Sequence, residues 1–263
     1  MSHDSTKKTI QVALGVCAVC SVLVATATVS LEAIQNQNKK LDKIENILAA
    51  GGLEDENKNP IDIYEENIKP IIIELKSGRT LAANEYDAVL NPDKFDVKKL
   101  KGDPKYSEPI PADEDLANVK TRPKYMAVYQ LVDKNKNVEA YILPIYGKGL
   151  WSTLFGFISL DKDLKTVRGI TFYEHGETPG LGGEVDNKKW KATWKNKVAL
   201  DDQGKVILNV IKGTVDKSDP MANSKIDGLS GATLTTRGVN NLIQYWLGEN
   251  GYGPFFNKVR KGV

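Results

Sequence analysis

One stretch near the start of the chain limits what this protein can be, because residues 9–31 contain no charged side chain. A helix of about 23 residues rises roughly 34 Å, enough to cross the hydrocarbon core of a bilayer. Ala25-Thr26-Ala27 offers an alternative, the small-residue cleavage site of a signal peptide, but the apolar run exceeds the ~7–15 residues of a signal core. We therefore predict an uncleaved transmembrane helix over residues 9–31, preceded by a tail of residues 1–8.

Both cysteines of the chain, Cys17 and Cys20, lie within this apolar segment. Their spacing of three residues puts them on one face of a helix, which also fits a metal-binding or redox pair. No His or acidic residue accompanies them inside the segment. We therefore expect them to be small packing residues.

The lysines around the segment do not decide which side of the membrane the rest of the chain occupies. Lys7 and Lys8 precede the segment and favour a cytoplasmic N-terminus. Three lysines follow it closely and oppose that bias: Lys39, Lys40 and Lys43.

The charge and hydropathy of the whole chain exclude several classes of protein. Lys plus Arg total 36 and Asp plus Glu total 34, a formal charge of +2, without the basic excess that nucleic-acid-binding proteins show. The mean hydropathy is too low for a protein with many membrane spans. No cluster of Cys, His and carboxylates suggests a metal site. We expect a globular protein with neither a metal ion nor a nucleic-acid partner.

Beyond the span, apolar residues continue at spacings of three and four as far as Gly51-Gly52. This pattern predicts a helical extension or linker over residues 32–52. The globular domain is expected over residues 53–263. Within it, residues 87–123 read as a loop-rich segment, since prolines punctuate a charged stretch there.

Apolar runs rich in β-branched and aromatic residues predict the strands of this domain. They cover residues 126–132, 138–146, 154–160, 167–173 and 206–211. The first four form two hairpin-like pairs around polar turns. The sequence therefore predicts an α+β fold, with a mainly antiparallel sheet flanked by helices.

The clearest helix lies near the C-terminus. Its apolar residues share one face: Val239, Leu242, Ile243, Trp246 and Leu247. Thr235 or Thr236 is expected to cap its start, and Gly248 to end it.

Two segments rich in glycine and small residues can carry chemistry. The first segment leads into the C-terminal helix, where free N–H groups can bind a phosphate, and its sequence is Asp227-Gly228-Leu229-Ser230-Gly231-Ala232-Thr233. The alternative is an ordinary helix cap with glycines that serve the turn. The second segment follows a predicted strand, and its pattern predicts a loop: His175-Gly176-Glu177-Thr178-Pro179-Gly180-Leu181-Gly182-Gly183.

The sequence SGAT after Asp-Gly resembles the flavinylation motif of FMN-binding domains in bacterial respiratory complexes. The resemblance implies that Thr233 carries FMN through a phosphoester bond, and that a separate Mg-dependent flavin transferase supplies the FMN from FAD. It also implies that the loop ETPGLG lies against the flavin ring and that Gly149-Leu150-Trp151-Ser152 lies close to it. The residues it assigns to cofactor binding are Ser230, Gly231, Ala232, Thr233, Leu234, Thr235, Leu150, Trp151, Glu177, Thr178, Pro179, Gly180, Leu181 and Gly182.

Three further residues each have two interpretations, a functional role or an ordinary structural role. Trp151 can pack on the flavin ring or be one of four tryptophans of a core. Lys212 is a candidate cation beside the ring, against the alternative of a surface lysine. His175 can be a proton carrier or a metal ligand, although a lone His is usually structural.

Longer stretches, YGKGLWSTLFGFISL and TFYEHGETPGLGGEVDNKKW, resemble the NqrC family of the Na+-translocating NADH:quinone oxidoreductases. This resemblance implies an electron-relay protein with no catalytic residue of its own, acting between NADH and ubiquinone beside the A, B, D, E and F subunits of the complex. It also implies a single-pass protein of the bacterial inner membrane with its domain in the periplasm. The alternatives are an RnfG-like flavoprotein of an Rnf complex and a cofactor-free, membrane-anchored binding module.

Overall fold

The computed structural model describes residues 5–100 and 102–262, so part of the predicted tail, residues 1–4, lies outside them. The chain divides into two compact units, one up to Lys43 and one from Ile44 onward. Helix α1 (Thr6–Gly51) runs through the predicted span and most of the predicted extension. The second unit thus begins before residue 53, because Ile44, Ile47 and Leu48 at the end of α1 are buried in its core.

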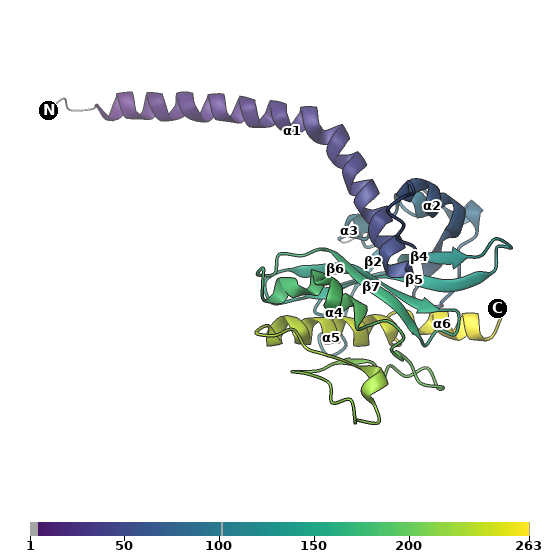
Figure 1. The fold of residues 1–263 in the computed structure, drawn as a ribbon. Coiled ribbons are helices and arrows are strands. Elements are labelled where there is room, and N and C mark those ends of the chain that lie inside the picture. The colour runs from purple at the N-terminus through teal and green to yellow at the C-terminus, as the bar shows by residue number, and fades with distance from the viewer. Residues whose placement is uncertain (1–4, 101, 263) are drawn as a thin grey trace. The chain divides into compact units, whose positions relative to one another are not determined.

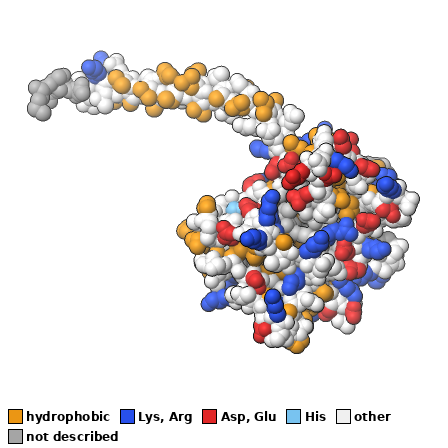
Figure 2. All heavy atoms as spheres, in the orientation of Figure 1, with side chains coloured by type: hydrophobic (Ala, Val, Ile, Leu, Met, Phe, Trp, Pro, Cys, Tyr) orange, Lys and Arg blue, Asp and Glu red, His pale blue; other side chains and the backbone are white. Residues whose placement is uncertain are grey.

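In the part of the first unit that the structure describes, residues 6–43 form the N-terminal part of α1. It contains a segment long and apolar enough to cross a membrane, and none of that segment is buried. Figure 2 shows apolar side chains along it. Both Cys17 and Cys20 are free and exposed there, as small residues on a membrane-facing helix would be.

The second unit is built on a five-stranded antiparallel sheet in the order β1-β4-β5-β6-β7 (Figure 1). Its strands are β1 (Ile68–Glu74), β4 (Tyr125–Val132), β5 (Val138–Lys148), β6 (Thr153–Asp161) and β7 (Val167–Glu174). Strands β4 to β7 form a meander, and its hairpins β4–β5 and β6–β7 are the two that the sequence predicted. Asp133 and Asp163 fix two of the turns by accepting hydrogen bonds from the backbone N–H groups that follow them.

Helices cover both faces of the sheet (Figure 1). Ile142 of β5 lies against Gly51 at the end of α1, whereas Gly147 of the same strand lies against Leu242. Side chains five residues apart on a strand point to opposite faces, so the end of α1 and helix α5 (Thr233–Leu247) lie on opposite sides of the sheet. The other helices are α2 (Pro60–Asn67), α3 (Val97–Leu100), α4 (Lys188–Ala192) and α6 (Gly253–Arg260).

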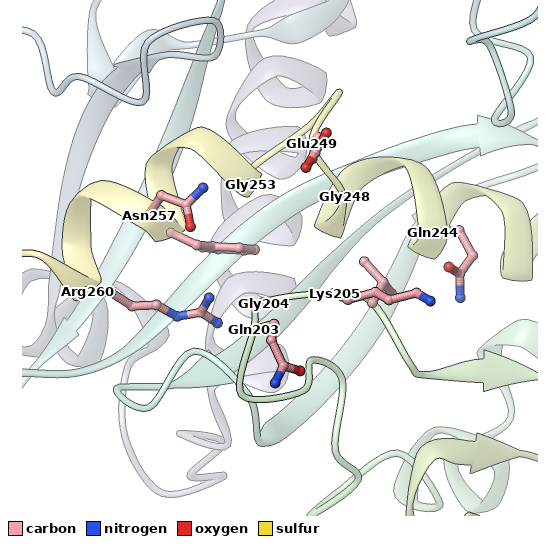
Figure 3. A pocket seen from close by; sticks show the side chains of 11 residues that line it. Gln203, Gly204, Lys205, Gln244, Gly248, Glu249, Gly253, Asn257 and Arg260 are labelled. Atoms are coloured by element: carbon pink, nitrogen blue, oxygen red, sulfur yellow. The ribbon is translucent and has the colours of Figure 1, made fainter.

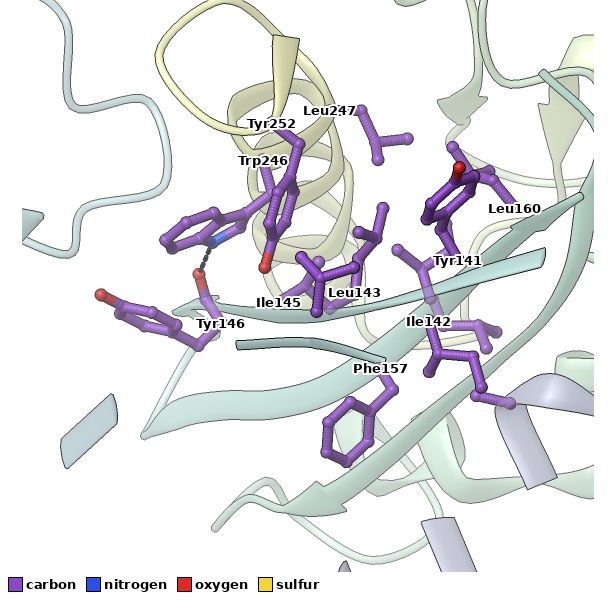
Figure 4. Close-up of a cluster of buried hydrophobic side chains, with 14 of the residues drawn as sticks. Tyr141, Ile142, Leu143, Ile145, Tyr146, Phe157, Leu160, Trp246, Leu247 and Tyr252 are labelled. Carbon is purple, nitrogen blue, oxygen red and sulfur yellow. Dashed lines mark hydrogen bonds between the residues drawn. The ribbon is translucent and has the colours of Figure 1, made fainter. Parts of the chain in front are cut away.

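The core between the sheet and the C-terminal helices is aromatic (Figure 4). Trp246 is fully buried, and its indole N–H donates to the carbonyl of Tyr146 at 2.5 Å. The hydroxyl of Tyr252 donates to the carbonyl of Pro144 at 2.7 Å. These two bonds tie the end of α5 and the turn before α6 to the backbone of β5.

Two sequence predictions need correction, the strand over residues 206–211 and the cap of the C-terminal helix. The predicted strand over residues 206–211 contains only β8 (Asn209–Val210), which pairs in parallel with β9 (Lys225–Ile226) outside the main sheet. Ile207 and Leu208 instead donate to the carbonyl of Ala199. The loop-rich segment 87–123 holds, besides single turns, α3 and the short strands β2 (Ser107–Pro109) and β3 (Thr121–Pro123).

The second correction concerns the start of α5. The helix begins at Thr233, after Ala232, and no side chain caps it. Thr235 and Thr236 lie inside the first turn, where both hydroxyls bind elsewhere in the domain. Gly248 ends the helix, as predicted.

Candidate functional site

The carboxylate of Glu177 connects three segments that the sequence singled out separately. It accepts hydrogen bonds from the N–H groups of Leu150 (3.2 Å), Trp151 (3.0 Å) and Ser152 (3.1 Å), in the turn between β5 and β6. It also accepts one from the hydroxyl of Thr235 in α5, at 2.6 Å. The structure therefore brings together the GLWS turn, the ETPGLG loop and the start of α5.

Glu177 is ionised at neutral pH although its residue is only 5% exposed. Burial raises the pKa of its carboxyl, but the hydrogen bonds from Thr235 and from the three backbone N–H groups outweigh burial and leave the pKa below its ordinary value. The buried charge is thus held by neutral donors of the chain.

The threonines at the start of α5 have different environments. Thr235 is 1% exposed and donates to Glu177, and Thr236 is 4% exposed and accepts a hydrogen bond from the N–H of Leu229 at 2.9 Å. Thr233, by contrast, is exposed at the first position of the helix. Because the first N–H groups of a helix lack intrahelical partners, Thr233 stands where a phosphate is favoured.

The loop that follows Glu177 approaches the SGAT turn. Gly231 has a φ of +71°, a conformation that favours glycine, and a Cβ built there would lie 3.0 Å from the Leu181 side chain. Within this loop Thr178, Pro179 and Gly180 are exposed, and Gly182 is buried against Thr235.

Several large apolar side chains are exposed around the start of α5. Trp151 is 67% exposed, which excludes the reading of this residue as part of the core. The other members of this set are Leu150, Leu181 and Leu234. Ser230 is also exposed, and Ala232 is buried. Exposed apolar side chains beside an exposed hydroxyl and free helix N–H groups fit a ligand with an aromatic ring and a phosphate, as FMN has.

His175 and Lys212 have lesser places in this arrangement. His175 Nδ1 accepts from the N–H of Glu177 at 3.2 Å and its Nε2 lies 2.7 Å from Asp186, so its contacts hold the loop. Lys212 is exposed, and the backbone beside it packs on the turn: the N–H of Gly228 donates to the carbonyl of Gly213 at 2.8 Å.

Ser152 was expected near the flavin only as part of the GLWS stretch and was not assigned to cofactor binding. Its hydroxyl accepts from the N–H of Gly176 at 2.7 Å and lies 3.4 Å from Glu177. Its place directly after Trp151 is the one signal in the sequence that could have found it.

A surface cavity of about 350 Å³ lies away from these motifs (Figure 3). It is bounded by the loop around Gly204, the end of α5 and helix α6, and its lining includes Gln203, Lys205, Gln244, Asn257 and Arg260. Elsewhere, residues 5–100 and 102–262 hold no group of three His, Cys or acidic residues that could bind a metal ion.

Comparison with known proteins identifies the family. The family model of the FMN-binding domain matches residues 149–248, which hold the GLWS turn, the ETPGLG loop and the SGAT turn. The C subunit of the Na(+)-translocating NADH-quinone reductase of Pseudomonas aeruginosa is 45% identical over 99% of this chain and 98% of its own length. The chain belongs to this family. The Yersinia pestis member is 42% identical over 100% of this chain and 96% of its own.

Solved structures agree with this assignment. The crystal structure of Shewanella oneidensis NqrC matches with a TM-score of 0.76 and 34% identity, over 85% of this chain and 99% of that one. The family member from Parabacteroides distasonis matches with a TM-score of 0.62 and 25% identity, over 87% and 96%. The α+β fold with an apolar N-terminal helix is confirmed, and so is the resemblance to NqrC.

Membership of the NqrC family establishes a coarse function. The chain is part of an oxidoreductase complex, the Na+-translocating NADH-quinone reductase, and it carries an FMN-binding domain. Its apolar N-terminal helix fits the membrane anchor of such a complex.

Proposed function

We propose that this chain carries FMN in a phosphoester bond to Thr233 and relays electrons between redox centres of other subunits, on the way from NADH to ubiquinone. The observation that carries the proposal is the contrast within the first turn of α5. Thr233 is exposed, whereas the hydroxyls of Thr235 and Thr236 are buried and already bonded.

Ser230 is the other exposed hydroxyl residue of the motif. It lies in the turn three residues before the helix, whereas Thr233 is the first helical residue. A phosphodiester carries a negative charge, which the partial positive charge of a helix start stabilises most within its first turn. This favours Thr233 over Ser230 as the acceptor.

In the attachment reaction, Thr233 Oγ1 accepts the FMN phosphoryl group of FAD. A new P–O bond forms to this oxygen, the pyrophosphate P–O bond breaks, AMP leaves and the hydroxyl proton is lost. Within the described part of the chain, no basic side chain is hydrogen-bonded to Thr233. We therefore assign the proton transfer to a Mg-dependent flavin transferase that acts as a maturation partner.

After attachment, FMN supplies the redox chemistry of the chain. The exposed side chains of Leu150, Trp151, Leu181 and Leu234 provide an apolar surface that excludes water from an adjacent ring. Removing water from one side of a redox group shifts its potential, and such tuning is what a protein contributes to a cofactor site. Lys212 is a secondary candidate for the ring environment, because the carbonyl of the next residue, Gly213, accepts a hydrogen bond from the N–H of Gly228 in the turn before α5.

We further propose that the domain faces the periplasm and docks with the A, B, D, E and F subunits of the complex. The name shared by the relatives supports a multi-subunit assembly. The periplasmic side is supported by the resemblance to flavinylated respiratory proteins.

The proposal is tested with Thr233→Val in the full-length protein, produced together with the flavin transferase. Loss of the hydroxyl removes the phosphoryl acceptor, so the fluorescent band on a denaturing gel should vanish. Ser230→Ala is the matched control, because it removes the other exposed hydroxyl, and it should keep the band. Fluorescence that persists in Thr233→Val, or a wild-type band that is absent altogether, would contradict the assignment.

A further inference from the structure

Glu177 is a buried acid without a cationic partner. Its residue is 5% exposed, and none of the ion pairs in the described part of the chain includes it. A buried carboxylate is costly unless hydrogen bonds occupy its oxygens. Here they do: Oε1 accepts from Trp151 and Ser152, and Oε2 accepts from Leu150 and Thr235.

The three backbone donors are consecutive. The N–H groups of Leu150, Trp151 and Ser152 converge on one carboxylate, a concave arrangement of successive N–H groups that binds anions. The turn is closed by the N–H of Gly149, which donates to the carbonyl of Ser152 at 2.8 Å. The exposed side chains of Leu150 and Trp151 therefore stand on a turn whose backbone is fixed by a residue from another loop.

The carboxylate is enclosed on its remaining sides. A Cβ at Gly149 would lie 2.6 Å from Oε1, and a Cβ at Gly182 would lie 2.8 Å from Oε2 and 2.5 Å from the hydroxyl oxygen of Thr235. Real Cβ atoms do not approach so closely, so any other residue at these positions would displace Glu177. Both carboxylate oxygens accept hydrogen bonds, and Gly149 and Gly182 leave no space beside them. Glu177 therefore affects a ligand indirectly, through the positions of the residues that donate to it.

We propose that Glu177 is the positioning residue of the flavin site: it joins the 149–152 turn to the first turn of α5, and so sets Trp151 and Leu150 at a fixed place relative to Thr233. This inference rests on the proposed function, because it concerns the arrangement around FMN on Thr233. The bond from Thr235 has a second effect, since it keeps that hydroxyl buried and leaves Thr233 as the accessible threonine.

The first arm of the test examines the positioning itself in the full-length protein without flavin. Glu177→Gln keeps the size of the side chain but replaces one acceptor oxygen by a donor. Hydrogen exchange at the amides of Leu150, Trp151 and Ser152 should become at least tenfold faster, while the amides of β5 and β6 keep their protection. Glu174→Gln is the matched control, because it removes the same charge from an exposed side chain of the neighbouring strand end, and it should leave these amides unchanged.

The second arm uses the flavin-loaded protein, because a merely structural residue would not change the flavin once the protein is folded. Glu177→Gln should retain the covalent flavin on Thr233 but shift its midpoint potential and visible spectrum, and Glu174→Gln should shift neither. Unchanged amide exchange, or a wild-type potential in folded Glu177→Gln, would overturn the inference. Absence of flavin from wild-type protein would instead overturn the proposed function.

Thr235→Val keeps the inference testable if Glu177→Gln does not fold. This variant removes one donor to the carboxylate and leaves the three backbone bonds in place. It should shift the potential in the same direction as Glu177→Gln by a smaller amount, with the flavin still attached to Thr233. A wild-type potential in Thr235→Val would then count against the inference.

Discussion

At the scale of single residues, Glu177 has an effect on stability whose sign depends on pH. Its pKa in the folded domain is lower than in the unfolded chain, so the carboxylate stabilises the fold above the unfolded value of about 4.3. That stabilisation is lost as the pH falls through the lower, folded pKa. Each buried donor left without an acceptor costs about 1–3 kcal/mol.

This pH dependence leads to a prediction for urea unfolding of Glu177→Gln. At pH 7 the variant should unfold with a free energy lower than that of the wild type by about 1–3 kcal/mol. The difference should shrink as the pH is lowered below about 4, because the wild-type carboxyl becomes protonated there and loses its advantage. A difference that stays constant from pH 7 to pH 3 would mean that the charge of Glu177 does not contribute to the free energy of unfolding.

Trp151 and Leu181 allow ring environment and folding to be separated. Both side chains are exposed, so Trp151→Ala and Leu181→Ala should change the free energy of unfolding by no more than about 0.5 kcal/mol. If both side chains pack on the flavin ring, each variant should keep the fluorescent band but shift the visible spectrum and midpoint potential. Wild-type spectra and potentials in a double variant would show that the ring lies elsewhere.

At the scale of secondary-structure elements, Gly238 sets how closely α5 approaches the β5–β6 turn. A Cβ at this position would collide with the carbonyl oxygen of Lys148 and would lie 3.0 Å from the Cα of Gly149. Gly238→Ala should therefore destabilise the domain by about 1–3 kcal/mol in urea unfolding, through overpacking. Replacement of glycine by alanine inside a helix normally stabilises by about 1 kcal/mol. A loss of stability in Gly238→Ala would therefore show that the close contact with the turn outweighs helix propensity.

Gly176→Ala is the control for this substitution. It lies in the same site, but its Cβ would meet only the side chain of Ser152 at an ordinary distance of 3.4 Å. It should leave stability and flavin attachment unchanged. A stabilised Gly238→Ala would show that α5 can move away from the turn at no cost.

The elements also show which parts of the structure a sequence can predict. Strands β4 to β7 were predictable because each pairs with its neighbour in the chain across a short turn, which is polar between β4 and β5 and between β6 and β7. Strand β1 was not, because it pairs with β4 across the long segment that includes α3. The start of α5 was misjudged for the same reason: the acceptor of the Thr235 hydroxyl, Glu177, comes from a loop 58 positions earlier. The motifs themselves were recognisable, but their junction at one carboxylate was not.

At the scale of the whole molecule, the division at residue 43 predicts that the domain folds without its anchor. A protein that begins at Ile44 retains the buried residues Ile44, Ile47 and Leu48. It should be soluble and unfold with the same midpoint in urea as the full chain in detergent. A protein that begins at Gly52 loses these side chains and should be less stable by several kcal/mol, since each large buried aliphatic side chain contributes about 2–5 kcal/mol. Equal stability of the two proteins would contradict the position of the boundary.

The orientation of the chain in the membrane gives the last prediction. Lysines flank the apolar segment on both sides, two before it and three shortly after it, so charge alone does not orient it. If the domain faces the periplasm, a reporter enzyme that works only outside the cytoplasm should be active when fused after Val263. A fluorescent reporter that matures only in the cytoplasm, fused at the same position, should stay dark. The opposite pair of results would place Thr233 in the cytoplasm, and a flavin transferase acting in the periplasm could then not reach its hydroxyl.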